Sequence, residues 1–317
     1  MVNAASLRIV FLGTPAFAVP SLDALLGSRH RVVAVLTRPD RPRGRGQRMF
    51  DAPVKARAAA AGIPVLQPDR LRDPAFVESL AALRADLGVV AAYGAMLPES
   101  VISAPRLGTI NVHASLLPRY RGAAPVHRAI IAGERETGVT IMRIVKRLDA
   151  GPMLASVTRS IGREETSVDV ERDLAHLGAA LLVEIADGLA EGSVAETPQD
   201  EDAATYAPRL TKDDGAIDWS WPAARIHDLI RGLHPWPHAF SFLDGRRFIL
   251  IASTADGLTA SSDAPGTIVE SEGDRLVVAT GNGALRLLQI QPEGKRSMSV
   301  RDFLAGHRTA RGARFSP

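Results

Sequence analysis

The sequence predicts an α/β fold: a mostly parallel sheet with helices on both faces, followed by a smaller domain built as a β-barrel or sandwich. Short apolar strands alternate with helical segments through the first half of the chain. A polar stretch then spans 191–208, and beyond it short strands recur between turn residues. Because 317 residues are long for one hydrophobic core, we expect two domains, over 1–190 and 209–317, with 191–208 as their linker.

The order of the elements follows from the apolar pattern. The first strand, 7–12, ends at Thr14 and Pro15, which are suited to cap and to open a helix that runs to Leu26. The other strands of the first half are expected over 31–37, 63–66, 87–92, 108–112, 140–145 and 153–161, and the other helices from near Pro53, from Pro74 and over 166–189. In the second half, a helix over 222–232 precedes strands over 239–243, 246–251, 266–270, 275–280 and 284–289.

Composition excludes several kinds of chemistry. The chain has no cysteine and therefore no disulfide, no cysteine–zinc site and no thiol nucleophile, which fits a cytoplasmic protein. We expect no secretory signal, and the longest apolar run, 87–97, is too short to cross a bilayer. The net charge of +3 says little about partners, because basic residues gather locally at 38–48 and 295–314.

A polar pair closes the strand expected over 108–112. Asn111 and His113 are two residues apart, so on an extended backbone both side chains leave on the same face. Ligands of parallel sheets bind at the carboxyl ends of the strands, and there an amide and an imidazole can stabilise an oxyanion or relay a proton. The alternative is a polar strand end that only caps the following loop.

Asp149 is the second candidate for chemistry. It precedes Gly151 in a turn between two expected strands, near the same edge of the sheet. A carboxylate close to His113 would orient the ring and raise its basicity, or accept a proton itself. The alternative is a turn aspartate that bonds only its own backbone. No second histidine lies three or four residues from His113, so we expect no metal site.

Arginines crowd the segment after the second expected strand. They are Arg38, Arg41, Arg43, Arg45 and Arg48, and the prolines and glycines between them disfavour a helix. Arginine binds phosphate groups through two parallel hydrogen bonds, so this loop and the basic C-terminal patch would suit a long polyanion. The alternative for both patches is solvated surface.

Three motifs resemble those of a known family. They are Asn-Val-His-Ala-Ser-Leu-Leu-Pro at 111–118, Tyr-Arg-Gly-Ala-Ala-Pro at 120–125 and Leu-Asp-Ala-Gly at 148–151. Together they resemble the signature of 10-formyltetrahydrofolate-dependent formyltransferases. The runs 11–15, 38–46 and 231–237 further resemble the members of that family that formylate the methionine carried by initiator tRNA. The resemblance extends over essentially the whole chain.

The resemblance implies a Rossmann-like catalytic domain and an OB-like β-barrel that holds tRNA. It implies that Asn111, His113 and Asp149 are catalytic, and that tetrahydrofolate lies against Ser115, Leu116, Leu117 and Pro118. The arginine loop would contact the acceptor end of methionyl-initiator tRNA, with Arg45 the best-matched position. The formyl donor would be 10-formyltetrahydrofolate, no metal would be needed, and we expect a monomer.

Three other functions fit parts of the pattern. The nearest is a formyltransferase for a small amine, such as a nucleotide sugar or glycinamide ribonucleotide, which would share the folate motif without needing the arginine loop. A tRNA-binding module with a degenerate catalytic core is the second, and the intact residues at 111, 113 and 149 argue against it. The third is a nicotinamide-dependent oxidoreductase, but the turn after the first strand lacks the required G-x-G-x-x-G spacing.

Overall fold

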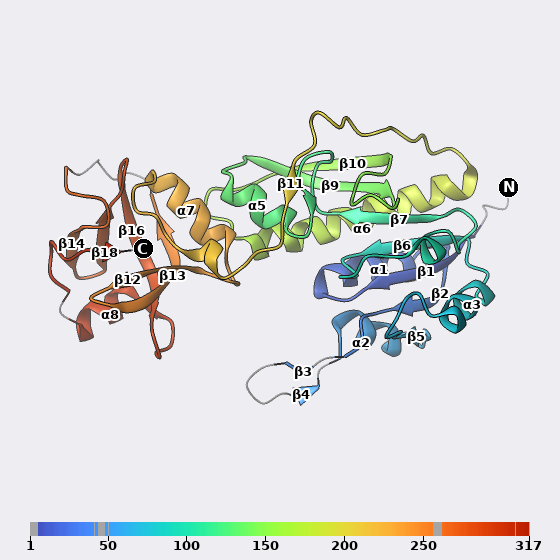
Figure 1. The fold of residues 1–317 in the computed structure, drawn as a ribbon, viewed down its shortest axis with the longest axis horizontal. Helices are drawn as coiled ribbons and strands as arrows, with labels where there is room; N and C mark the ends of the chain where they lie inside the picture. Colours follow the sequence, from blue (N-terminus) through green and yellow to red (C-terminus); the bar gives the residue numbers. More distant parts are fainter. Residues whose placement is uncertain are drawn as a thin grey trace. The chain divides into compact units, whose positions relative to one another are not determined.

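The computed structural model describes residues 6–40, 51–255, 262–307 and 309–316, together with the backbone of 42–43 and 48–49 (Figure 1). Contacts divide the chain into two compact units that interleave along the sequence. Unit 1 comprises Met1–Gly122, Thr137–Arg159 and Glu171–Tyr206, and unit 2 comprises Ala123–Glu136, Ser160–Val170 and Ala207–Pro317. The division into 1–190, 191–208 and 209–317 stays a prediction.

Within the described residues, seven strands form the sheet of unit 1. In spatial order they are β10 (Met153–Ser160), β9 (Glu136–Arg143), β7 (Thr109–His113), β6 (Leu87–Ala91), β1 (Arg8–Gly13), β2 (Arg31–Leu36) and β5 (Val65–Leu66). Neighbouring strands from β7 to β5 are parallel, whereas β9 runs antiparallel to β7. The prediction of a mostly parallel sheet is therefore confirmed, and each strand predicted in the first half is present with slightly shifted ends.

Helices lie on both faces of this sheet. They are α1 (Val19–Leu26), α2 (Pro53–Ala60), α3 (Pro74–Ala82), α4 (Glu99–Ile102) and, for most of its length, α6 (Ser167–Glu191). Leu12, Val90 and Asn111 are register neighbours and share one face, where Leu12 and Val90 pack in a core with α3 and α4. On the opposite face α6 lies so close to β7 that a Cβ on Gly178 would come within 2.8 Å of Cγ1 of Val112.

The segment after β1 differs from the prediction. A 3₁₀ turn, η1 (Ala16–Ala18), comes first, and α1 begins at Val19 without a side-chain cap. The hydroxyl of Thr14 donates instead to the carbonyl of Tyr93 at 2.9 Å and accepts the backbone N–H of Arg38 at 3.3 Å. The prediction that Thr14 caps this helix is wrong, because its hydroxyl ties together the loops that follow β1, β2 and β6.

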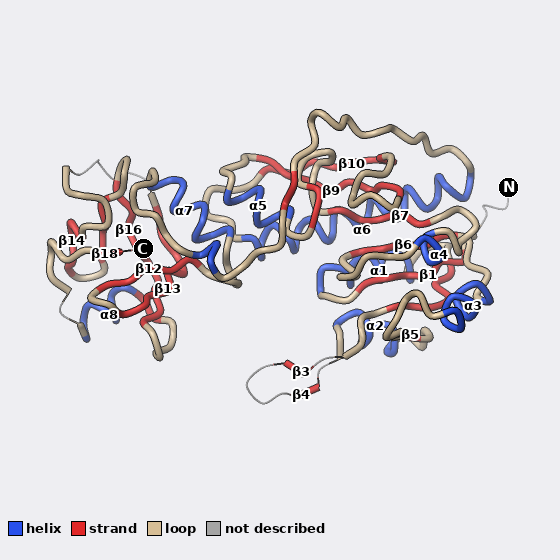
Figure 2. The backbone as a smooth tube through the Cα atoms, in the orientation of Figure 1, coloured by secondary structure: helices blue, strands red, loops and turns tan. Residues whose placement is uncertain are grey.

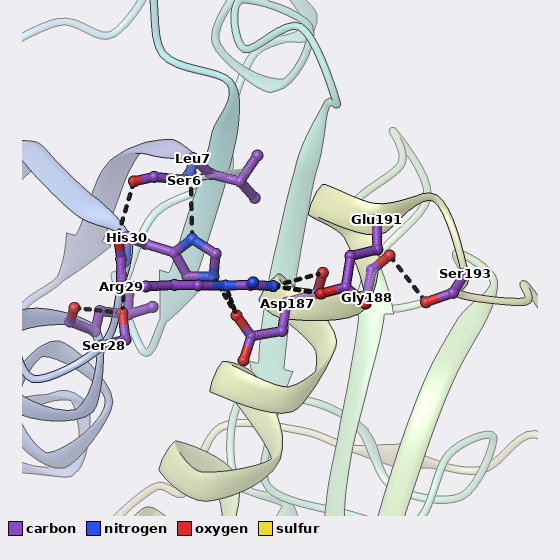
Figure 3. A network of polar contacts seen from close by, with 10 residues as sticks. Ser6, Leu7, Ser28, Arg29, His30, Asp187, Gly188, Glu191 and Ser193 are labelled. Carbon is purple, nitrogen blue, oxygen red and sulfur yellow. Dashed lines mark hydrogen bonds and ion pairs between the residues drawn. The ribbon is translucent and has the colours of Figure 1, made fainter. Parts of the chain in front are cut away.

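A polar network joins the C-terminal end of α6 to the residues that directly precede strands β1 and β2 (Figure 3). Arg29 donates to the carboxylates of Asp187 and Glu191, and Nε2 of His30 lies 3.2 Å from Oδ1 of Asp187. Nδ1 of His30 accepts the backbone N–H of Leu7. Burial lowers the pKa of His30, although Asp187 acts in the opposite direction. The hydrogen bond from Leu7 acts in the same direction as burial, because a protonated Nδ1 could no longer accept it.

Unit 2 contains an antiparallel sheet. Its strands, in the order in which they pair, are β14 (Ile268–Glu272), β15 (Arg275–Ala279), β16 (Ala284–Pro292), β13 (Arg246–Thr254), β12 (Ala239–Leu243) and β18 (Phe315–Ser316), and β17 (Met298–Ser299) pairs with β16. The two ends of this order meet, because Ile268 donates to the carbonyl of Ala313 and Phe315 donates to that of Gly266, each at 2.8 Å. The sheet thus curls into a barrel, and the predicted fold class is confirmed in this half also.

The remaining elements are short. They are α5 (Pro125–Ile131), α7 (Ala223–Gly232), α8 (Val300–Gly306), η2 (Asp213–Gly215), β3 (Pro42–Arg43), β4 (Arg48–Met49), β8 (Arg121–Gly122) and β11 (Tyr206–Ala207). The predicted helix over 222–232 corresponds to α7. Across the part of the chain that the structure describes, none of the helices has both the length and the apolar character needed to span a membrane.

Candidate active site

Asn111 and His113 lie at the carboxyl end of β7. Asn111 is in register with Val90 of the parallel strand β6, and His113 is in register with Thr140 of β9. Because side chains alternate along a strand, both residues leave on the face opposite to Val112, which packs against α6. Asn111 is half-buried and His113 is 5% exposed. The edge of the sheet therefore presents an amide and a largely buried imidazole on one side.

Asp149 meets His113 from the turn between β9 and β10. Its Oδ2 lies 3.8 Å from Nδ1 of His113 and accepts the backbone N–H of Gly122 at 2.9 Å. Nε2 of His113 lies 3.1 Å from the carbonyl oxygen of Tyr120. Since a carbonyl can only accept, Nε2 carries a hydrogen, and Nδ1 is the ring nitrogen that faces the carboxylate. Among the residues described, no group of three or more histidine, aspartate or glutamate side chains is arranged to hold a metal ion.

The backbone of this turn explains its residue types. Asp149 has φ +46°, in the left-handed region that aspartate tolerates better than most residues. Two residues later, a Cβ on Gly151 would lie 1.9 Å from the carbonyl oxygen of Arg143. Only glycine fits there, so the Asp-x-Gly spacing is a requirement of the turn that carries the carboxylate.

The turn after β7 contains the four residues predicted to line the folate site. The hydroxyl of Ser115 donates to the carbonyl four residues later at 2.7 Å, and Thr140 donates to the carbonyl of Ser115 while accepting the N–H of Leu117. The bond between Leu117 and Pro118 is cis. Ser115 and Leu117 are buried, whereas Leu116 and Pro118 are partly exposed. The Ser115 hydroxyl and the Leu117 N–H are thus used in hydrogen bonds that stabilise the turn. The accessible surface of the turn comes from Leu116 and Pro118.

The arginine segment is described only in part. Arg41 and Arg45 lie outside the described residues. Arg43 and Arg48 are described through their backbone and are opposite each other where β3 and β4 pair as an antiparallel ladder. The side chain of Arg38 is half-buried. The predicted loop therefore contains a short hairpin that the sequence did not indicate.

Both flanks of the arginine segment are held by one residue of α2. The ammonium group of Lys55 binds the carboxylate of Asp40 on one side and that of Asp51, at 2.8 Å, on the other. The hydrogen bond from Lys55 lowers the pKa of Asp40. Gln67 adds a second tie, because it donates to Asp40 at 3.1 Å and to the carbonyl of Arg38 at 2.9 Å. The ends of the segment are therefore tied to α2 and to Gln67 within unit 1.

Comparison with known proteins identifies the family. Residues 7–186 match the formyl transferase family, and residues 209–308 match the formyl transferase C-terminal domain. The first match alone covers more than half of the chain. The chain belongs to the formyl transferase family.

Relatives of this formyl transferase match it over nearly its whole length. Methionyl-tRNA formyltransferase from Methylococcus capsulatus is 48% identical over 304 residues, which are 96% of this chain and 98% of the relative. The enzyme of the same name from Pseudomonas entomophila is 47% identical over 302 residues, 95% of this chain and 96% of the relative. The solved N-formyltransferase from Helicobacter canadensis, in complex with folinic acid and dTDP-3-aminofucose, has a TM-score of 0.68 over 90% of this chain and 99% of its own. At 17% identity, that likeness shows the fold alone.

This formyl transferase also has residues near Asp149 that the sequence did not single out. Arg121 is completely buried and binds Gln199 and Glu201, and Gln199 in turn binds the backbone of the Asp149 turn. Gln199 and Glu201 belong to the polar stretch predicted to be a linker. No local signal in the sequence indicates these contacts, because the partners of Arg121 lie 78 and 80 positions away along the chain.

Proposed function

We propose that this formyl transferase moves the formyl group of 10-formyltetrahydrofolate to the α-amino group of methionine esterified to initiator tRNA. The product would be N-formylmethionyl-tRNA for translation initiation. The observation that carries the proposal is the match to the Methylococcus capsulatus methionyl-tRNA formyltransferase, 48% identical over 96% of this chain and 98% of that relative. Because the match includes both halves of the chain, it supports the identity of the acceptor as well as that of the donor.

The chemistry requires a neutral amine. Its nitrogen forms a bond to the formyl carbon, the bond from that carbon to N10 of the folate breaks, one proton leaves the amine and one is delivered to N10. A free α-amino group has a pKa of about 7.7–8.0. Esterification of the neighbouring carboxyl group lowers that pKa, so much of the amine is already neutral at physiological pH.

We assign the reacting groups from their positions around the end of β7. Attack on the formyl carbon places negative charge on the formyl oxygen, and the amide of Asn111 together with His113, once Nδ1 has taken up a proton, would stabilise it. One such donor typically contributes about 2.7–4 kcal/mol to the stability of the transition state. Asp149, with its carboxylate 3.8 Å from Nδ1 of His113, would orient the ring and stabilise its charge as the amine loses its proton.

The two substrates would use different parts of the protein. Tetrahydrofolate would lie against the turn Ser115–Pro118, where Leu116 and Pro118 supply apolar surface. The arginines at 38, 41, 43, 45 and 48 would contact phosphates at the acceptor end of the tRNA, on a segment whose two flanks Lys55 holds in place. The barrel of unit 2 would hold more of the tRNA. We further propose that the protein acts as a monomer in the cytoplasm.

An assay of acceptor specificity tests the proposal. The protein is incubated with 10-formyltetrahydrofolate and, separately, with methionyl-initiator tRNA, methionyl-elongator tRNA, free methionine and a dTDP-linked amino sugar. We expect rapid formylation of methionyl-initiator tRNA only. Formylation of the amino sugar alone would overturn the proposal and leave a small-amine formyltransferase, and the absence of transfer from the folate to any acceptor would overturn the reaction itself.

A further inference from the structure

The polar stretch after α6 crosses the edge of unit 1 next to the Asp149 turn. Figure 2 shows it as a long loop that leaves the end of α6, and Figure 1 labels β11, the strand to which it leads. Within it, Nε2 of Gln199 donates to two carbonyl oxygens of the turn, that of Asp149 at 2.8 Å and that of Gly151 at 2.7 Å. Oε1 of Gln199 accepts Nε–H of Arg121 at 3.0 Å. Because a guanidinium only donates, these partners fix the orientation of the amide, with its NH₂ group toward the turn.

Arg121 gives Gln199 a rigid support. Its side chain is 0% exposed, and Nη1 and Nη2 each donate to one carboxylate oxygen of Glu201 at 3.0 Å. These bonds raise the pKa of Arg121 and lower that of Glu201. Glu201 also pairs with Arg147 at 2.6 Å. A buried guanidinium is stable only when it is paired, so Arg121 keeps Glu201, and with it the segment around Gln199, in one place.

The contacts close a ring through Asp149. Gly122, the residue after Arg121, donates its N–H to the carboxylate of Asp149, and Gln199 binds the carbonyl of the same residue. The carboxylate and the backbone of Asp149 are thus held by the two ends of one connected network. A non-glycine residue at φ +46° is in the left-handed region and persists only where its surroundings hold it. The network supplies that restraint.

We propose that Gln199 is a positioning residue for formyl transfer, which acts on the reaction by fixing the backbone of the turn that presents Asp149 to His113. Arg121 and Glu201 form the base that holds Gln199. The inference rests on the proposed catalytic role of Asp149. It gives the polar stretch a function at the active site in addition to connecting two parts of the chain.

Two substitutions of one residue test the role. Gln199→Ala removes both donors to the turn, and Gln199→Glu keeps an acceptor for Arg121 but offers only oxygens to two carbonyl groups. We expect kcat to fall about tenfold to a hundredfold in both, because small displacements of a reacting group cost that much. The KM values for charged tRNA and for the folate should stay close to those of the wild type. Thr197→Ala in the same stretch keeps its backbone bridge to Met153 and serves as the matched control, with unchanged kcat.

Hydrogen exchange provides a readout that does not depend on activity. In Gln199→Ala, the amide of Gly122 should exchange faster than in the wild type and in Thr197→Ala, because the carboxylate that it binds is no longer held. Thermal unfolding of the three proteins shows whether the fold is intact. Unchanged exchange at Gly122 together with wild-type kcat would overturn the proposal, and so would a loss of kcat that only follows a loss of folded protein.

A double-mutant cycle separates this inference from the proposed function. If Gln199 acts through Asp149, then adding Gln199→Ala to Asp149→Asn should reduce kcat by less than about twofold further. A full additional loss would show that Gln199 acts elsewhere and would overturn the inference while leaving the reaction intact. If Asp149→Asn alone had the wild-type kcat, the catalytic role of Asp149 would fail, and the inference would fail with it.

Discussion

Nδ1 of His113 faces Oδ2 of Asp149 at 3.8 Å, a separation too long for a hydrogen bond. Nε2 of the ring is engaged with the carbonyl of Tyr120, so the neutral imidazole presents the lone pair of Nδ1 to the carboxylate. A proton that arrives at Nδ1 is attracted by the carboxylate and gains a partner there. The pair is therefore arranged to receive a proton, and catalytic hydrogen bonds commonly shorten to their working length when substrate binds.

Removal of either group on β7 should abolish most turnover. We expect His113→Ala to lower kcat by about 10²–10⁴ and Asn111→Ala by about 10²–10³, because each variant loses a donor or a proton carrier at the reacting centre. Single-turnover formylation measures the chemical step, and filter binding of charged tRNA should remain nearly unchanged. His176, which is exposed on α6, provides the control substitution to alanine. Wild-type rates in both variants would contradict the assignment.

Two substitutions at Asp149 separate charge from backbone conformation. Asparagine tolerates φ +46°, so Asp149→Asn should lose activity while keeping the stability of the wild type. Asp149→Ala should lose the same activity and also about 1–2 kcal/mol of the free energy of unfolding, because alanine is strained in the left-handed region. Urea unfolding measures the difference. Equal stabilities of the two variants would mean that the backbone relaxes when the carboxylate is removed.

The salt dependence of tRNA use tests the arginine segment. Arg45→Ala should lower kcat/KM for charged tRNA and reduce the slope of log(kcat/KM) against log[salt] by about 1, since one phosphate contact is lost. Arg72, an exposed arginine outside that segment, is the matched control, and Arg72→Ala should leave the slope unchanged. The same slope in both variants and in the wild type would exclude Arg45 as a phosphate contact.

The stability of unit 1 should depend on the protonation of His30. Its pKa is lowered in the folded protein by burial, with Arg29 acting in the same direction and Asp187 against it. The unfolded chain therefore binds a proton more readily, so the free energy of unfolding falls as the pH drops below about 6.5 toward the folded pKa. Asparagine at this position can accept the N–H of Leu7 without titrating. His30→Asn should thus show a weaker loss of stability between about pH 7.5 and 5.5 in urea unfolding.

The effect of His30 is the difference between the pH dependence of unfolding of the wild type and that of His30→Asn. Other histidines titrate in the same range, but they are common to both. If the wild type and His30→Asn showed the same pH dependence, His30 would have the same pKa in the folded and in the unfolded chain, and a lowering of that pKa within the network of Figure 3 would be excluded.

The sequence was sufficient to locate the strands of unit 1 and to place Asn111 and His113 together at the candidate site. Apolar runs located β1, β2, β5, β6 and β7, and the two-residue spacing of Asn111 and His113 placed them on one face because side chains alternate along any strand. The direction of β9 was not predictable, since an apolar run has the same pattern in a parallel and an antiparallel strand. Helix α5, with seven residues, is too short to show a helical period.

Contacts between distant polar residues were the part that sequence reasoning missed. Thr14 is of a residue type that often caps helices, but its hydroxyl donates to the carbonyl of Tyr93, 79 positions away. Gln199 lies 50 positions from Asp149 in a stretch without apolar periodicity, so no local pattern indicates which carbonyl groups it binds. Such pairs are decided by the packing of the backbone, which a one-dimensional pattern does not contain.

The contacts of Gln199 also determine where the enzyme can be cut. A fragment of residues 1–190 would contain Asn111, His113 and Asp149, yet it would end before the amide that holds the turn and the carboxylate that neutralises Arg121. Such a fragment would bury an unpaired cation beside the residues that we propose to be catalytic. During synthesis, likewise, the network that holds the Asp149 turn cannot form until residues near 200 have left the ribosome, so its last part to be made is the one with the least recognisable sequence.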